Sequence, residues 1–364
     1  MSAPAVPQSP TDPSTLAPAR TLRVGIAGLG RAGAAHAIML AATRGCELAG
    51  VADPRGGARA GLRGMGFTVP AFPRVERLLE KASPDAVFVC TAQHERARVA
   101  TAVLEAGIPV LVERPMARTL AEAEALVGLA AAKGVPLAVG HPLAFEPVFA
   151  RMHEAVHAGA LGAVVQARSA MFVSRVFAPH PRRGPGRLDP RRVAGGVVAH
   201  LASDLLFVLV HMLGAPVEVR ATWNLIYGAV EDELHGMMKL GDGTEVGFDC
   251  SWSVPGYQRA STVIEIEGRD GRLLASDEAL ELELQRPAAG FRSGSTRLRE
   301  AEFESPARFD FGGEALYVQD AAFLRWVAGG AVPPNAAFRA FAAQVVMDAL
   351  YRSAAAGGAD VKVT

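Results

Sequence analysis

Short apolar runs alternate with helical segments through the first 140 residues of the chain. Residues 119–133 have a helical pattern whose start, Thr119 followed by Glu122, matches the spacing of a capping box. Residues 95–105 form another helical segment, which ends at an Ala-Gly pair. Strand-type runs fall at 24–27, 47–52, 86–90, 108–112 and 136–139. This alternation predicts a parallel sheet with helices on both faces.

The pattern changes after residue 142, where helical segments and then successive strands follow. The sequences at 241–243 and 269–271, Gly-Asp-Gly and Arg-Asp-Gly, are typical of hairpin turns. We therefore expect an α/β fold with a parallel-sheet domain at 21–142 and a second domain at 143–364, whose sheet is mostly antiparallel and open. Helices are predicted at 147–157, 196–213, 314–328 and 336–354, and strands at 163–173, 217–225, 232–240, 244–252 and 260–267.

The composition fits two globular domains. Half of the 364 residues are hydrophobic and the formal net charge is zero, so no overall field favours nucleic acid or an anionic membrane. No apolar run reaches the length needed to span a bilayer. Residues 1–20 are rich in Pro, Ala, Ser and Thr and lack the basic start and apolar centre of a signal peptide. We interpret them as a disordered leader.

Three cysteines, Cys46, Cys90 and Cys250, lie far apart within apolar stretches. This placement is typical of buried thiols in a reducing compartment and not of a disulfide framework. No cluster of Cys and His has the spacing of a metal site. The sequence therefore predicts a cytoplasmic protein without a bound metal.

A glycine-rich turn follows the first strand-type run. Gly28, Gly30 and Gly33 have the spacing G-x-G-x-x-G, and an Ala-rich helical segment begins there. In a dinucleotide-binding turn, the first glycine permits the tight turn and the second lets the backbone approach a pyrophosphate. The third glycine lets the helix pack close to the strand. The same spacing also occurs in structural turns without a ligand, so the motif needs support from its surroundings.

That support comes from Asp53, which ends the second apolar run twenty positions after Gly33. An acid at this distance is expected to bind the ribose hydroxyls of a dinucleotide. It would repel a 2′-phosphate, which favours NAD, while Arg55 two residues later leaves NADP as the alternative cofactor. Since the carboxyl ends of parallel strands meet at one edge, Thr91–His94 and Glu113–Pro115 should lie around the same crevice.

Further motifs connect these features to a known family. The glycine turn is followed by His36, and the run at 106–115 reads AGIPVLVERP. Gly195-Gly196 precedes a long helical segment, and the chain closes with the segments 311–314, FGGE, and 319–323, QDAAF. On these residues, nearly the whole chain resembles the Gfo/Idh/MocA oxidoreductases, which include glucose–fructose oxidoreductase and inositol dehydrogenase.

The resemblance implies a Rossmann domain that binds NAD or NADP, hydride transfer at a sugar or polyol carbon, and a second domain whose sheet often mediates oligomers. The residues at 113–115 match a Glu-Lys-Pro tripeptide near the nicotinamide, and a cis peptide bond is expected before its proline. For His94, a polar residue at a helix start is the alternative interpretation. The predicted cofactor contacts are Gly28, Leu29, Gly30, Arg31, Ala32, Gly33, Asp53, Thr91, His94, Glu113 and Pro115.

Positions that the family uses for catalysis differ in this chain. The family's lysine, which helps in catalysis and substrate binding, is Arg114 here, and arginine does not exchange protons near neutral pH. The family's Asp and His, four residues apart, correspond to His200 and Asp204, and a further acid corresponds to Phe207. We expect His200 to accept or donate the proton, Asp204 to orient it and Arg114 to hold the substrate. The alternative is a structural contact between His200 and Asp204.

Two further residues are candidates for the substrate site. Arg187 belongs to a basic loop at 174–192 ahead of the glycine pair, where family members contact substrate, and the sequence RLD at 187–189 resembles a common WRLD segment. A solvated loop is the alternative interpretation of this run of charge. His141 follows Gly140 at a predicted strand end, and it either faces the crevice or is an ordinary polar residue.

The sequence thus predicts an NAD(P)-dependent dehydrogenase or reductase that acts on a sugar, sugar acid, nucleotide sugar or cyclitol and forms a homo-oligomer. The changed catalytic positions favour an alternative, a dinucleotide-binding protein that has lost catalysis and serves as a sensor or assembly partner. A third interpretation is a related reductase for a non-sugar substrate, similar to biliverdin reductase. No motif for nucleic-acid or membrane binding accompanies these features.

Overall fold

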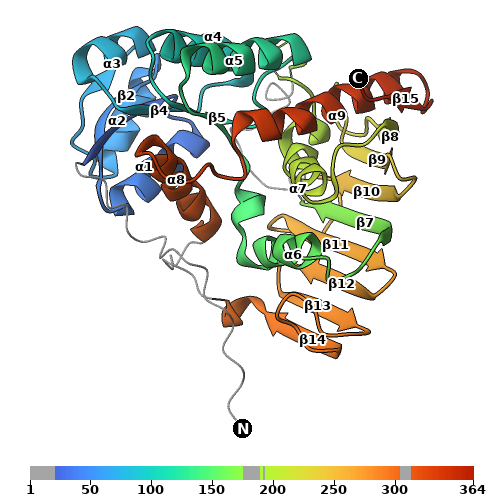
Figure 1. Cartoon of the computed structure of the whole chain (residues 1–364). Coiled ribbons are helices and arrows are strands. Elements are labelled where there is room, and N and C mark those ends of the chain that lie inside the picture. The colour runs from blue at the N-terminus through green and yellow to red at the C-terminus, as the bar shows by residue number, and fades with distance from the viewer. Residues whose placement is uncertain (1–20, 175–188, 192, 304–312) are drawn as a thin grey trace.

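Two β-sheets organise the protein, as Figure 1 shows for the computed structural model. The structure describes residues 21–174, 189–191, 193–303 and 313–364. The predicted leader at 1–20 and Arg187 lie outside the described residues. One sheet has six strands and the other has nine, so the predicted α/β class with two sheets is confirmed.

The first sheet has the strand order β3 (Ala71–Phe72), β2 (Cys46–Ala52), β1 (Leu22–Ala27), β4 (Ala86–Val89), β5 (Val110–Glu113) and β6 (Leu137–Gly140). Its strand pairs are parallel, as predicted. The central strands are apolar apart from Arg23 of β1, and Val24, Ile26 and Phe88 have no exposed surface. The strand order changes direction between β1 and β4, which is where ligands bind in such sheets.

The helices that follow these strands are α1 (Arg31–Ala42), α2 (Gly56–Gly64), α3 (Val75–Ala82), α4 (Gln93–Glu105) and α5 (Leu120–Lys133). Helix α5 starts at the predicted capping box, in which Thr119 and Glu122 each accept the other's backbone N–H. Helix α4 starts at Gln93, two residues before the predicted start. This start places a glutamine amide at the carboxyl end of β4.

The second sheet has the strand order β14 (Gly294–Arg299), β13 (Ala279–Leu284), β12 (Gly271–Ser276), β11 (Ser261–Gly268), β7 (Val164–Phe172), β10 (Glu245–Ser251), β9 (Glu233–Lys239), β8 (Glu218–Asn224) and β15 (Val361–Lys362). Its strand pairs are antiparallel, except that β7 and β10 run parallel. The predicted turns at 241–243 and 269–271 connect β9 to β10 and β11 to β12. The sequence prediction misses β12 to β15, although Leu280, Leu282 and Leu284 alternate with glutamates and are buried.

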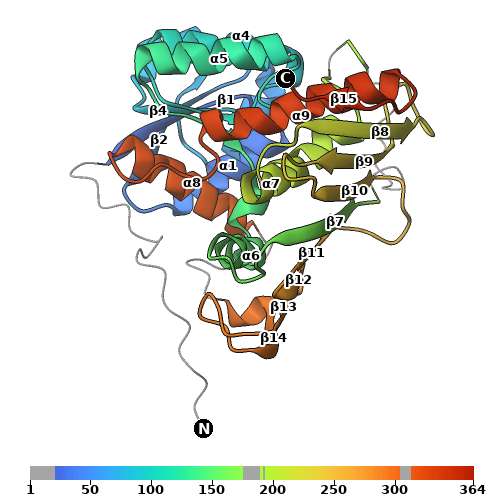
Figure 2. The same ribbon diagram turned by 45° about the vertical axis from the view of Figure 1, so that its right-hand side comes forward.

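Helices α6 (Pro147–His157), α7 (Ser203–Leu213) and α9 (Ala337–Ala355) lie on one face of the second sheet (Figure 2). The helix predicted at 196–213 is divided, because a π-helical turn at Val198–Ala202 precedes α7. None of the helices in the described part of the chain combines the length and hydropathy that crossing a bilayer requires. Short 3-10 helices occupy Pro142–Phe145 and Glu300–Glu302.

Helix α8 (Glu314–Val327) returns to the first sheet after most of the second sheet is complete. It packs against α1, and its Phe323 meets Phe88 edge to face with ring centroids 5.5 Å apart. Between α8 and α9, Asn335 accepts the backbone N–H of Val139 and donates its side-chain amide to the Val139 carbonyl. The last part of the chain therefore connects both sheets.

Candidate active site

The glycine-rich turn links β1 to α1. The structure explains differently why a glycine stands at each of its three positions. Gly28 has a φ of 95°, and a Cβ there would lie 2.6 Å from the carbonyl carbon of Cys90. A Cβ on Gly33 would lie 1.9 Å from the carbonyl oxygen of Gly28. A Cβ on Gly30 would meet no described atom within 4 Å. The fold itself thus requires Gly28 and Gly33, whereas Gly30 leaves open space at the helix N-terminus, where a pyrophosphate fits.

Asp53 lies beside this turn at the end of β2 and is only 3% exposed. Its Oδ2 accepts the backbone N–H of Leu29 at 2.7 Å, and its carboxylate also accepts the backbone and guanidinium of Arg55. Burial alone would raise the pKa of Asp53, but the hydrogen bonds from Arg55 and Leu29 outweigh it and lower the pKa. The Arg55 side chain is 65% exposed, so it can turn away from Asp53 without losing packing.

The loops after β4 and β5 carry the next predicted contacts. Within the described structure, Thr91 Oγ1 and His94 Nδ1 are buried and have no hydrogen-bond partner, as expected of atoms that a ligand completes. Arg96 holds the two loops together, because it donates to the carbonyl of Pro115 at 2.7 Å and to that of Thr91 at 3.1 Å. The sequence prediction misses Arg96, although an arginine on the same buried face of α4 as Val99, Ala100 and Val103 is itself a signal.

Glu113 belongs to a buried ionic network that joins three elements. His36 of α1 contacts Glu113 Oε1 through Nε2 at 3.1 Å and Asp320 Oδ2 of α8 through Nδ1 at 2.7 Å. Burial opposes the charged ring, but the two carboxylates outweigh it and raise the pKa of His36 to about 10. Burial likewise opposes the charged form of Glu113, but His36 and nearby arginines lower its pKa to about 2. The network therefore fixes the residue that precedes Arg114.

Arg114, His141 and Asp204 meet beside the carboxyl ends of β5 and β6. The peptide bond between Arg114 and Pro115 is cis, as the resemblance implies. Asp204 lies 3.5 Å from Arg114 Nη2 and 3.2 Å from His141 Nδ1, and the His141 ring stacks on Phe207 with centroids 4.4 Å apart. Burial lowers the pKa of His141, while Asp204 acts in the opposite direction. The cluster thus holds a cation, an imidazole and a carboxylate together.

The contacts of Asp204 differ from the expected pairing with His200. His200 lies in the π-helical turn, its Nε2 is 3.4 Å from the Nε2 of Gln93, and its ring centroid is 6.0 Å from that of Trp252. A π-turn has more residues per turn than an α-helix, so a four-residue spacing that crosses its end does not align two side chains as in a regular helix. His141, the weaker of the two imidazole candidates in the sequence, is the ring that contacts Asp204.

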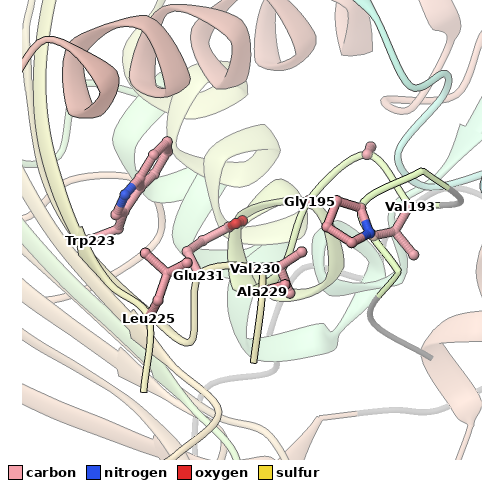
Figure 3. Close-up of a pocket in the computed structure, with 9 residues that line it drawn as sticks. Val193, Gly195, Trp223, Leu225, Ala229, Val230 and Glu231 are labelled. Atoms are coloured by element: carbon pink, nitrogen blue, oxygen red, sulfur yellow. The ribbon is translucent and has the colours of Figure 1, made fainter. Parts of the chain in front are cut away.

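A pocket of about 220 Å³ lies next to the glycine pair that precedes this turn (Figure 3). Glu231 forms part of its wall and accepts the backbone N–H of Gly196 and the hydroxyl of Tyr351, both at 2.7 Å. A Cβ on Gly195 would lie 1.8 Å from the Tyr351 hydroxyl, and one on Gly196 would lie 2.0 Å from the Glu231 carbonyl oxygen. The glycine pair is therefore required by close packing. The pocket is lined by Pro190, Val193, Ala194, Gly195, Trp223, Leu225, Ala229, Val230 and Glu231.

These features define a class of protein. The parallel sheet offers an open glycine turn, a buried acid and unpaired polar atoms that fit a dinucleotide, and the adjoining cluster offers groups that bind and exchange protons with a hydroxyl. Within the described residues, no group of three or more His, Cys, Asp or Glu side chains could hold a metal ion. The arrangement is that of a nucleotide-dependent oxidoreductase.

Comparison with known proteins identifies the family. A family model described as "Oxidoreductase family, NAD-binding Rossmann fold" matches residues 22–141, and one described as the "GFO/IDH/MocA C-terminal domain" matches residues 149–274. The chain therefore belongs to the Gfo/Idh/MocA family of oxidoreductases, and its first sheet belongs to an NAD-binding Rossmann domain.

Several relatives are similar over most of the chain. Inositol 2-dehydrogenase 1 of Saccharopolyspora erythraea is 30% identical over 298 residues, which cover 73% of this chain and 84% of that protein. The 1,5-anhydro-D-fructose reductase of Ensifer adhaerens is 29% identical over 260 residues, which cover 70% and 72%. The structure of GenD2 from gentamicin A biosynthesis in complex with NAD has a TM-score of 0.79 at 25% identity, and 99% of this chain and 100% of that chain are covered. Levoglucosan dehydrogenase with NADH and levoglucosan shares the fold, with a TM-score of 0.83 at 20% identity and coverage of 94% and 99%.

Proposed function

We propose that the protein transfers a hydride between NAD and a CH–OH group of a sugar, sugar acid, nucleotide sugar or cyclitol. The observation that carries this proposal is the cluster of Arg114, His141 and Asp204 at the edge of the sheet where the glycine turn opens. A fixed cation and a carboxylate–imidazole pair are suited to hold a hydroxyl, whose proton we assign to His200 in the π-helical turn that leads into α7. The names of the relatives, an inositol dehydrogenase and an anhydrofructose reductase, support the same substrate class.

The proposed contacts with the cofactor follow from the residues around the glycine turn. Bound NAD supplies the hydride acceptor, and NADH supplies the donor. We assign the backbone of Gly28, Leu29, Gly30, Arg31, Ala32 and Gly33 to the pyrophosphate, Asp53 to the ribose hydroxyls, and Thr91, His94, Glu113 and Pro115 to the nicotinamide half. Asp53 favours NAD, and the exposed Arg55 beside it keeps NADP as the alternative.

On the substrate side, each residue has a separate task. Arg114 holds a substrate oxygen, because its guanidinium keeps its charge and has donors beyond those used by Asp204. His200 accepts or donates the hydroxyl proton. Asp204 keeps Arg114 and His141 in place, and His141 is a second imidazole within reach of the substrate. Arg187, outside the described residues, remains a proposed contact for an anionic or hydroxylated substrate.

The decisive experiment is a screen of sugars, sugar acids, nucleotide sugars and inositols for a change in nicotinamide fluorescence. On a substrate found in this way, loss of a general base typically lowers turnover about 10²- to 10⁴-fold, and we expect H200A to fall in this range with unchanged affinity for NAD. D204N should lose less, and R114K should mainly raise KM. The matched control is H157A, because His157 is exposed at the end of α6 and away from the proposed interface. Unchanged turnover in H200A would remove His200 from the mechanism.

The replacement of the family's lysine by Arg114 favours a second candidate function. A protein with this site that binds NAD without turnover would be a dinucleotide-dependent sensor or assembly partner. The substrate screen separates the two candidates, because both require NAD to bind and only the enzyme consumes substrate. Calorimetry establishes that NAD is bound. Binding of NAD together with a negative screen would support the second candidate.

We also propose that the protein is a cytoplasmic homo-oligomer of two domains that meet near residue 142, with small molecules and neither nucleic acid nor membranes as partners. The face of the second sheet opposite α7 supports self-association, because Met237 and Val263 are 38% exposed on it and exposed apolar residues of a sheet often mark an interface. Sedimentation tests the proposed homo-oligomer. A wild-type protein that is a monomer at micromolar concentration would contradict it, and in that case M237D would have no effect on the mass.

A further inference from the structure

Gln93 is a residue to which neither the sequence motifs nor the family resemblance assigns a role. It is the first residue of α4, at the carboxyl end of β4, and its side chain is buried with 7% of the residue exposed. Its amide contacts two segments that belong to the second half of the chain. Oε1 accepts the backbone N–H of Ala194 at 2.5 Å, and Nε2 lies 3.4 Å from Nε2 of His200.

The contact with Ala194 decides which way the amide points. A backbone N–H can only donate, so the amide atom that faces Ala194 must be the oxygen. The amide NH₂ group therefore faces His200. Since the NH₂ group can only donate, the ring nitrogen that it meets must carry a lone pair and no proton.

We propose that Gln93 is a positioning residue that holds His200 in the tautomer with its proton on Nδ1 and a bare Nε2. This inference rests on the proposed function only where it assigns proton transfer to His200. The single lone pair of Nε2 accepts one hydrogen bond at a time, so a substrate hydroxyl replaces the Gln93 amide there before Nε2 takes its proton. By keeping Nε2 unprotonated, Gln93 prepares the ring for oxidation of a hydroxyl. In the reverse direction the same atom returns the proton.

Gln93 also fixes the backbone segment that leads to His200. Ala194 lines the pocket of Figure 3 and directly precedes the glycine pair that lies ahead of the π-helical turn. One side chain of the cofactor-binding half thus fixes both the backbone ahead of His200 and the ring of His200. Because α4 begins directly beyond Thr91, a shift of the cofactor loop would be transmitted to the imidazole through this single amide.

A substitution that reverses the hydrogen bond tests the tautomer directly. In Q93E, one carboxylate oxygen still accepts the N–H of Ala194, but the other can only accept a proton from the ring. The proton of His200 should therefore move to Nε2. Q285E is the matched control, because it introduces the same charge at an exposed glutamine, and it should leave His200 unchanged.

The measurement is the ¹⁵N spectrum of the full-length protein labelled at histidine, with the His200 signals identified by their absence in H200Q. We expect a bare Nε2 in the wild type and in Q285E, and a protonated Nε2 in Q93E. A protonated Nε2 in the wild type, or an unchanged ring in Q93E, would overturn the proposal. Q93M, which keeps the volume and removes both hydrogen bonds, should show a mixture of tautomers, and its melting curve shows whether the fold is retained.

Kinetics on a confirmed substrate separate this inference from the proposed function. We expect Q93E to lower kcat by about 10²-fold, with an unchanged KM for NAD and a displaced acidic limb of the pH profile. A purely structural role would lower the melting temperature without moving that limb. If H200A keeps its turnover while Q93E still changes the tautomer, proton transfer is not the task of His200, but the positioning role of Gln93 stands.

Discussion

Substitution of Gly30 by valine should remove NAD binding and leave the fold intact. The backbone at Gly30 has φ of −76° and ψ of −168°, which any residue adopts. A Cβ there meets no described atom within 4 Å, so the added side chain would occupy only the space in front of the helix N-terminus. Stability should therefore change by no more than about 1 kcal/mol, the size of a helix-cap effect.

The loss of affinity can be worked out from the hydrogen bonds that the pyrophosphate would lose. A hydrogen bond to a charged group contributes about 1.5–3 kcal/mol, and displacement of the cofactor by a branched side chain breaks at least two bonds from the first turn of α1. The expected change is thus about 3–6 kcal/mol, or roughly 10²- to 10⁴-fold in Kd. Isothermal titration of NAD and a melting curve on the same sample measure both quantities.

Gly33 provides the matched control for this prediction. Alanine at Gly33 would place its Cβ 1.9 Å from the carbonyl oxygen of Gly28, so G33A should lose about 3 kcal/mol or more of stability. The reasoning predicts opposite profiles, with lost binding in G30V and lost folding in G33A. Wild-type affinity for NAD in G30V at an unchanged Tm would refute the assignment of the turn to the pyrophosphate.

Three further predictions concern single side chains. NAD should bind more tightly than NADP, and D53S should reduce this preference in calorimetry, because Asp53 would repel a 2′-phosphate; tighter binding of NADP by the wild type would contradict this. H36Q should lose about 3–5 kcal/mol in chemical denaturation, because Asp320 stays buried without its charged partner. The stabilisation by His36, whose pKa is raised to about 10, is complete below pH 6.5 and is lost as the pH rises through 10, so the wild type should lose stability over this window and H36Q should not. Burial and the neighbouring His211 lower the pKa of His153 to about 4, so stability should fall as the pH drops from 6.5 to 4, and H153F should flatten that decline.

Features of the fold that depend on local sequence could be predicted. The glycine turn, the acid at the end of β2 and the capping box at Thr119 each involve residues close together in the chain, and each lies where the pattern places it. Mostly apolar runs predicted the strands of the first sheet for the same reason. The strands at 271–299 were missed, although their sequence contains the signal. Apolar and polar residues alternate from Leu280 to Leu284 as regularly as in the strands that the sequence predicts.

The contacts that complete the site could not be predicted, because they join distant segments. Asp320 meets His36 across 284 positions, and Gln93 meets His200 across 107. No local pattern distinguishes these side chains from other polar residues on helices. The partner of Asp204 was missed for a different reason, since the expectation assumed a regular helix and the chain forms a π-turn at Val198–Ala202.

The departures from the family pattern around Asp204 make physical sense as a group. A carboxylate with 3% of the residue exposed needs a permanent counter-charge, and Arg114 supplies one that cannot be lost by deprotonation, with Nη2 3.5 Å away. Phe207 stands where the resemblance expects another acid, and it stacks on His141 at 4.4 Å. An acid there would give His141 a second carboxylate and favour a permanently charged ring. With phenylalanine, burial keeps the pKa of His141 low against the opposing effects of Asp204 and, more weakly, of Glu113. Arginine, aspartate and phenylalanine at these positions therefore support one another. Replacing Phe207 by an acid would remove the ring that stacks on His141, and replacing Asp204 by histidine would leave Arg114 without its carboxylate.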